Sequence, residues 1–166
     1  MANMIPISTV TVGSGGSASI AFTSIPAIYT DLKLVISGRT SGGNQTMYFN
    51  ANADTTDANY NSRNVQGNGS TATSGTGNRL FMYLGQSGDT ANTFGTLEMY
   101  FPNYLSGTYK SFLVESVEEN NAAGAIMALA AGLWQSISPI NALTVTPYSG
   151  SFIQHSTATL YGIRKY

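Results

Sequence analysis

The side chains that most often perform catalysis are scarce in this chain of 166 residues. Cysteine is absent, and His155 is the only histidine. A cysteine nucleophile is therefore excluded, and a Ser-His-Asp triad could use only His155 as its base. His155 stands in a Gln-His-Ser sequence just before the last expected strand, which is more typical of a solvated loop histidine. A zinc site built from several histidines is excluded as well. We therefore expect no catalytic residue.

The eight carboxylates are the other groups that could do chemistry. A glycosidase needs two carboxylates that face each other across a cleft, and the sequence does not forbid such a pair. Glu118 and Glu119 are adjacent, so on a strand they would point to opposite sides. Asp54 and Asp57 offer the oxygens that calcium prefers, but the spacing of a calcium-binding loop is missing, and such residues more often hydrogen-bond their own backbone. We expect no metal and no cofactor.

The composition excludes several classes of partner. Charged residues make up only 9% of the chain, and the formal net charge is −1. The basic residues are scattered, so no run of lysine or arginine offers a surface for nucleic acid or anionic lipid. The first residues, Met-Ala-Asn-Met-Ile-Pro, lack the basic start and the long apolar core of a secretory signal, and the apolar segment 122–134 is too short to span a bilayer. We expect a protein made in a cytoplasm that binds neither nucleic acid nor a membrane.

Apolar and polar residues alternate along most of the chain, as they do in half-buried β-strands. Gly, Asn, Ser and Pro separate these runs, which number about ten, and no convincing amphipathic helix is present. We predict one all-β domain over residues 1–166, with a short N-terminal arm at residues 1–5. The predicted fold is a two-sheet antiparallel β-sandwich, with a jelly roll as the preferred topology.

Four segments carry more specific predictions. Residues 5–12 and 17–22 are expected to form a hairpin across a Gly-rich turn. Residues 53–78 show no sustained apolar period and are expected to form one long loop. Residues 79–84 are apolar on both sides, which indicates a strand buried twice, either between sheets or under a neighbouring subunit. The segment 122–134 is rich in helix-favouring residues, but its glycines and the surrounding rhythm favour a strand.

Bulky residues outside the clear core faces are the candidates for contacts with a partner, because aromatic residues and arginine are enriched at interfaces. These candidates are Tyr60, Arg63, Phe81, Tyr83, Tyr104, Tyr109 and Trp134. Other roles are open for some of them. Tyr60 would equally pin the long loop onto its own sheet, and Trp134 would equally fill the core if its indole N–H found an acceptor.

The last third of the chain carries a series of short motifs: Gly132-x-Trp134, Ile140-Asn141, Gly150-x-Phe152 and Ser156-x-Ala158-x-Leu160-Tyr161-Gly162-Ile163. This series resembles the C-terminal signature of a family of small virion proteins from tailed bacteriophages, many of which infect marine bacteria and cyanobacteria. Residues 22–39 and 48–50 are similar to the opening strands of that family. The matched segments are spread over most of the chain.

The resemblance implies a non-enzymatic structural protein of the phage particle. We expect a head decoration (cement) protein that is a homo-oligomer, with a trimer preferred, and that bridges the major capsid protein or another virion protein. A virion component is made inside the host and works outside it, which agrees with the missing signal and the low charge. The alternative is a tail-fibre or receptor-binding module in which Tyr60, Tyr104 and Tyr109 stack on host glycans. A glycan-active enzyme would require two facing carboxylates in a pocket.

Overall fold

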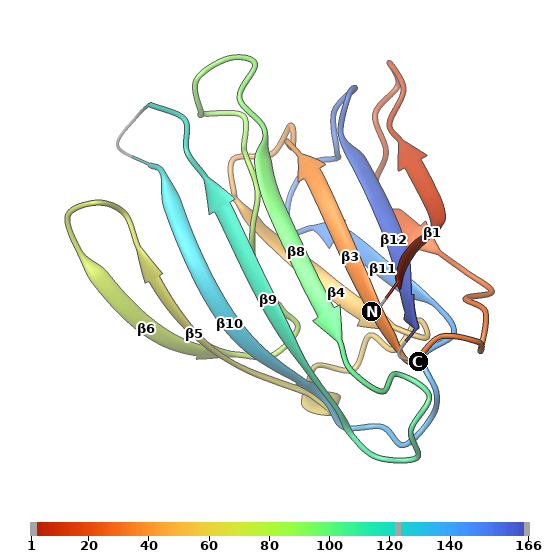
Figure 1. Cartoon of the computed structure of the whole chain (residues 1–166). Coiled ribbons are helices and arrows are strands. Elements are labelled where there is room, and N and C mark those ends of the chain that lie inside the picture. Colours follow the sequence, from red (N-terminus) through yellow and green to blue (C-terminus); the bar gives the residue numbers. More distant parts are fainter. Residues whose placement is uncertain (1–2, 122–123, 165–166) are drawn as a thin grey trace.

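The computed structural model describes residues 3–121 and 124–164, apart from the side chains of Leu80 and Phe81. Within these residues, twelve strands form two antiparallel sheets, one behind the other in Figure 1. This confirms the predicted all-β fold with two antiparallel sheets. No helix in the described ranges is long and apolar enough to cross a membrane.

The larger sheet has eight strands in the order β1-β12-β3-β8-β9-β10-β5-β6. Their bounds are β1 Asn3–Thr11, β3 Asp31–Gly38, β5 Tyr60–Gly67, β6 Ala72–Gly77, β8 Gly95–Phe101, β9 Lys110–Glu118, β10 Ile126–Trp134 and β12 Thr157–Arg164. The smaller sheet has the order β2-β11-β4-β7. Its strands are β2 Ile20–Phe22, β4 Thr46–Ala51, β7 Leu80–Tyr83 and β11 Leu143–Pro147, and a short 3-10 helix, η1, covers Asp57–Asn59.

Four pairs of strands that are consecutive in the chain divide between the two sheets: β1 with β2, β3 with β4, β7 with β8, and β11 with β12. The resulting orders, β1-β12-β3-β8 and β2-β11-β4-β7, are compatible with the preferred jelly roll, which stays a prediction. Two hairpins, β9–β10 and β5–β6, extend the larger sheet to one side (Figure 1). The candidate site described below lies on this extension.

The core lies between the sheets, because alternate residues of each strand face inward. Leu32, Leu34 and Ile36 of β3 are fully buried in this way. Three phenylalanines bridge the layers: the ring centroid of Phe49 in β4 lies 5.4 Å from that of Phe101 in β8 and 5.2 Å from that of Phe112 in β9. Aromatic contacts at this distance add to the stabilisation that burial itself provides.

The predicted long loop at residues 53–78 is wrong, because this segment contains η1 and the hairpin β5–β6. Ser, Thr, Asn and Gly fill most positions of the two strands, so no apolar alternation marks them. Strand β6 is the edge of the larger sheet and is exposed on both faces along nearly all of its length, so it needs no apolar face. Main-chain pairing with β5, from Ser62↔Gly77 to Gly67↔Ala72, holds it in place.

Two expectations about the N-terminal region are also wrong. Strand β1 pairs with β12, and β2 pairs with β11, so the hairpin expected between residues 5–12 and 17–22 does not form. The glycine-rich segment instead crosses between the sheets. Residues 3–5 of the expected N-terminal arm are part of β1 and pair with residues 162–164, whereas residues 1 and 2 lie outside the described ranges. The strand expected in segment 122–134 is confirmed as β10, and residues 122 and 123 lie outside the described ranges.

Gly132 gives a test of the packing between β9 and β10. A Cβ atom at this position would lie 2.3 Å from the ring of Phe112, which is buried between the sheets. Gly132→Ala should therefore lower the free energy of unfolding by about 1–3 kcal/mol, as overpacking of a core typically does. Gly107→Ala is the control, because a Cβ atom there would meet nothing within 4 Å. Urea unfolding of both variants checks the prediction, and equal stabilities would contradict it.

Candidate functional site

The outer surface of the sheet extension is apolar. Along β9 the residues alternate strictly between buried and exposed positions, and β10 follows the same pattern over most of its length. The exposed positions hold large apolar side chains, with exposed fractions from 42% to 61%: Val65 of β5, Leu113 and Val117 of β9, and Met127 and Leu129 of β10. We call these five residues the apolar face.

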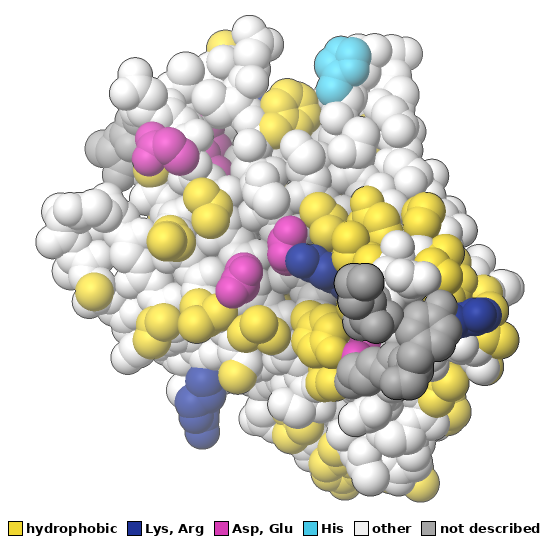
Figure 2. Space-filling view, viewed as in Figure 1, with side chains coloured by type: hydrophobic (Ala, Val, Ile, Leu, Met, Phe, Trp, Pro, Cys, Tyr) yellow, Lys and Arg dark blue, Asp and Glu magenta, His cyan; other side chains and the backbone are white. Residues whose placement is uncertain are grey.

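Strand register makes the apolar face continuous. Leu129 pairs with Val65 on one side and with Glu115 on the other. In the next row toward the C-terminal end of β9, Met127 pairs with Val117. Figure 2 views the molecule from this side and shows hydrophobic side chains over the sheet extension, with polar surface between some of them. Because residues paired across neighbouring strands lie close together, the side chains form one surface and not scattered points.

The apolar face lines two adjoining shallow hollows. The larger, of about 790 Å³, is lined by the outward residues of β5, β9 and β10 together with Ala72 and Ser74 of β6. The second, of about 630 Å³, continues past Leu129 and Leu113 to Arg63 and Thr76. Hydroxyl-bearing residues of β6 therefore form one rim of the apolar face.

Two unpaired charges lie on the same surface. Glu115 is exposed on β9, and Arg63 is exposed on β5 in the row of Ala131 and Leu113. Neither side chain forms an ion pair or a side-chain hydrogen bond among the residues that the structure describes. By contrast, Glu98 on the neighbouring β8 forms a 2.6 Å ion pair with Lys33. Glu115 thus lies within the apolar face, between Leu113 and Val117, and Arg63 lies at its border.

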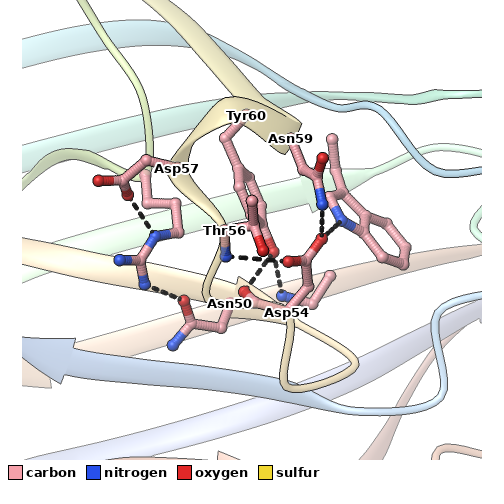
Figure 3. Close-up of polar contacts among 9 residues, drawn as sticks. Asn50, Asp54, Thr56, Asp57, Asn59 and Tyr60 are labelled. Carbon is pink, nitrogen blue, oxygen red and sulfur yellow. Dashed lines mark hydrogen bonds and ion pairs between the residues drawn. The ribbon is translucent and has the colours of Figure 1, made fainter.

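A polar network fixes the start of β5 and the end of β10, which are paired through Tyr60 and Trp134. The Asp54 carboxylate accepts hydrogen bonds from Trp134 Nε1 at 2.9 Å, from Asn59 Nδ2 at 2.8 Å and from the Thr56 backbone N–H at 3.0 Å. Figure 3 shows Asp54 at the centre of these contacts. Burial acts to raise the pKa of Asp54, but these hydrogen bonds outweigh it and hold the pKa below its ordinary value. The carboxylate is thus charged and used as a structural acceptor.

The Tyr60 hydroxyl belongs to the same network. It donates to the Asp54 carbonyl oxygen at 3.0 Å and accepts from the Ala51 backbone N–H at 3.0 Å. Beside it, Arg79 donates to Asp57 at 2.6 Å and to the Asn50 side chain at 2.7 Å (Figure 3). Asp54 and Asp57 therefore serve as acceptors for protein donors, as expected of such residues in loops. No group of three or more His, Asp or Glu suited to a metal ion occurs in the described part of the chain.

Buried charged residues stand at both ends of β9. At its start, the Lys110 ammonium donates to the carbonyl oxygens of Thr108 at 2.6 Å, Ser106 at 2.7 Å and Ser136 at 3.3 Å. Burial lowers the pKa of Lys110. At its end, the Glu118 carboxylate accepts from Asn120 Nδ2 at 2.7 Å and from Gln45 Nε2 at 3.0 Å. These contacts tie β9 to the loops around it.

Glu118 also meets a second acid, Asp89. Burial raises the pKa of Glu118 to about 7, and the neighbouring Asp89 carboxyl, with which it shares a hydrogen bond, acts in the same direction. Asp89 lies in a loop that the Arg39 guanidinium holds in place. The guanidinium donates hydrogen bonds to the backbone carbonyl oxygens of Asp89 at 2.9 Å and Thr90 at 2.7 Å. Because both acids are buried and in contact, no sugar ring fits between them, whereas the carboxyls of a glycosidase stand about 5 Å or more apart.

The structure separates the predicted contact residues into two groups. Tyr60, Tyr104 and Trp134 are at most 3% exposed. Their expected role as surface contacts is therefore wrong for this fold, because each polar group finds a partner inside: Trp134 and Tyr60 in the network around Asp54, and the Tyr104 hydroxyl on the Pro26 carbonyl. The alternative roles are the ones observed. Tyr60 holds the segment around Asp54 against the sheet, and Trp134 fills part of the core.

The remaining candidates keep some access to solvent. Arg63 is exposed, Tyr109 is 56% exposed, and Tyr83 is half-buried at the edge of the smaller sheet. The side chain of Phe81 lies outside the part that the structure describes. Of the three described candidates, Arg63 borders the apolar face. The contact roles of Arg63, Tyr83 and Tyr109 stay predictions.

Sequence reasoning missed the apolar face itself. A signal was present in residues 111–117, where both alternating sets contain large apolar residues: Phe112 and Val114 in one, Leu113 and Val117 in the other. A strand that is apolar on both sides has either two covered faces or one face that awaits a cover. The register that aligns these residues with Met127 and Leu129 came only from the structure.

No model of a known protein family matches the chain, and no curated protein matches it.

Glu118 predicts a pH dependence of stability. Its pKa in the folded chain is raised to about 7 from an ordinary value of 4.5. Between these values the unfolded chain releases a proton that the folded chain keeps, so the free energy of unfolding should fall as pH rises through this window, by on the order of 1–3 kcal/mol. Urea unfolding at several pH values should show this fall in the natural chain, and it should be absent in Glu118→Gln. The exposed neighbour supplies the control, Glu119→Gln, which should keep the fall. An unchanged slope in Glu118→Gln would contradict the assignment.

The hydrogen bonds that Asp54 accepts predict that removing its carboxylate oxygens lowers the free energy of unfolding. Asp54→Ala leaves the indole N–H of Trp134 and the Asn59 amide without their acceptor, at an expected cost of about 1–3 kcal/mol in the free energy of unfolding. Asp54→Asn keeps one acceptor oxygen and should cost less. Asp57→Ala removes an exposed carboxylate from an ion pair with Arg79, which keeps its hydrogen bond to Asn50, and should cost at most about 1 kcal/mol. Urea unfolding followed by tryptophan fluorescence ranks the three variants, and a cost for Asp57→Ala equal to that for Asp54→Ala would refute the prediction.

Proposed function

We propose that this chain is a non-enzymatic structural protein of a tailed-phage particle, with decoration of the head as its role. The observation that carries the proposal is the apolar face: Val65, Leu113, Val117, Met127 and Leu129 form one exposed surface on a regular, well-packed sheet. Burial of this surface against a partner would be favourable, because it removes apolar side chains from water.

The size of the apolar face supports contact with a protein. With strands about 4.8 Å apart and residues about 3.4 Å apart along them, its outline of three strands by five residues measures roughly 250 Å². Contiguous apolar patches of roughly this size and above are often functional on soluble proteins. Its hydroxyl-bearing rim on β6 and its flanking charges resemble the polar rim that surrounds the apolar centre of many interfaces.

The rigidity of the apolar face suits a holding role. Lys110 and Glu118 fix the ends of β9, and the network around Asp54 fixes the start of β5 against β10. A surface held in advance loses little conformational entropy when it is covered. In a lattice of many copies, modest contacts of this kind add through multivalency, and no chemical step is needed.

The assignment to a phage particle comes from the resemblance of the C-terminal motifs to small virion proteins. A decoration protein binds its own copies and the capsid shell, and its low charge agrees with contacts made mainly through apolar and amide groups. The capsid-facing contacts are expected at Tyr83 and Tyr109. Localisation in the virion after synthesis in the host cytoplasm is part of the same proposal.

The tail-fibre alternative now has less support than the head proposal. It depended on three tyrosines stacking on host glycans, and two of them, Tyr60 and Tyr104, are buried in the core. Tyr109 alone remains exposed among the three. A sugar-binding role would need a different set of aromatic residues, so we do not propose it.

Electron microscopy of the phage particle tests the proposal. Particles assembled with and without this chain should differ in density on the outside of the head, with the extra density repeated over the capsid lattice. Particles without it should also release their DNA at a lower temperature, because the shell has lost its bridging contacts. Unchanged shell density would contradict head decoration. Density confined to the tail would contradict it as well and would favour the tail-fibre alternative.

A further inference from the structure

We propose that the partner of the apolar face is a second copy of this chain, and that two apolar faces pack against each other around a two-fold axis that runs along β10. The inference builds on the proposed structural role and names the partner that covers this surface. It is tested in solution, without phage particles, so its failure can be told apart from failure of the proposed function.

Strand β10 is the centre of the apolar face, with β9 on one side and β5 on the other. A two-fold axis along β10 places β5 of one copy over β9 of its partner, and the reverse. Both sheets twist with the same hand, so two such faces stay in contact when their strands run nearly parallel, as in ordinary aligned packing of sheets. The arrangement therefore requires no change in the backbone.

The apolar residues match under this axis. Met127 and Leu129 lie on β10 and meet their own counterparts near the axis. Val65 lies over β9 of the partner at the level of Glu115, between Leu113 and Val117. Met127 is the most exposed of the five, at 61%, and borders the larger hollow. A methionine side chain is flexible and adapts to irregular gaps, so Met127 of the partner is suited to fill this hollow.

The two free charges complement each other in the same arrangement. Arg63 of one copy lies over β9 of its partner at the level of Leu113, because Arg63, Ala131 and Leu113 share one row. Glu115 is two residues farther along β9, about 7 Å away along the strand, within reach of an arginine side chain. Neither charge has an ion-pair partner among the described residues of its own chain. Each gains one across the axis, and symmetry produces this pair twice.

The area sets the expected affinity. The five strands from β6 to β8 span about 19 Å, and with a length of about 20 Å they give an outline of roughly 400 Å² per copy. Standard stable interfaces bury about 800 Å² per partner, so this contact belongs to the weaker class. We expect a dissociation constant in the micromolar range, so that the pair dissociates on dilution and persists at the high local concentration of an assembly.

Sedimentation velocity over a concentration series measures the association. The natural chain should shift from monomer to dimer with increasing concentration. Met127→Lys should raise the dissociation constant at least about tenfold, because it places a charge at the centre of the contact. Ala21→Lys is the matched control: Ala21 is an exposed strand residue on the smaller sheet, and its variant should associate like the natural chain. Circular dichroism verifies that both variants fold.

A charge exchange tests the arrangement itself. Arg63→Glu and Glu115→Arg should each weaken the dimer about tenfold, because each places two like charges together. The double variant, R63E with E115R, restores opposite charges and should return the dissociation constant to within about threefold of the natural value. A chain that stays monomeric at all concentrations, a trimer in place of a dimer, or a double variant no better than the single ones would each overturn the proposal.

Discussion

Strands β9 and β10 carry apolar residues on both faces, but a two-layer sandwich can bury only one face of each sheet. The inward face holds Phe112 and Val114 of β9 against small residues of β10, including Gly132, which leaves room for the Phe112 ring. The outward face is left with Leu113, Val117, Met127 and Leu129 in water. Because side chains alternate with a period of two, no shift of register could bury both sets. The exposed apolar surface is thus a direct consequence of the sequence within this fold, and the described residues leave it uncovered.

The polar groups of the extension show the complementary pattern. The Glu118 carboxyl and the Lys110 ammonium are buried, the Asp54 carboxylate is half-buried, and each has hydrogen-bond partners. On the outer surface, Arg63 and Glu115 have none among the described residues. Interior polar groups serve the fold, since a buried polar group without a partner is costly. Free charges on an apolar surface would fix the orientation of a contact if a partner carried opposite charges there. Both features agree with a protein whose work is to hold neighbours.

The all-β fold could be predicted from the sequence because most strands bury one face, and alternation such as Leu32, Leu34 and Ile36 reveals that face directly. The hairpin β5–β6 could not, because main-chain pairing alone holds an edge strand made of Ser, Thr and Gly. The contact roles given to Tyr60 and Trp134 were wrong for a related reason. Their polar groups require acceptors that come from other loops, and the sequence does not indicate which loop approaches them. The apolar face depended on the register between β9 and β10, which alternation within one strand does not determine.

The central claim is that the apolar face is covered when the protein assembles. Because the chain contains no cysteine, a single cysteine introduced in place of Met127 reports on this surface alone. Its rate of reaction with a thiol reagent can be compared between dilute protein and assembled particles, with a cysteine in place of Ala21 as the reference. The account predicts rapid modification in dilute protein and at least about tenfold slower modification in the assembly, since thiol reactivity requires access. Equal rates at position 127 in both states would contradict it.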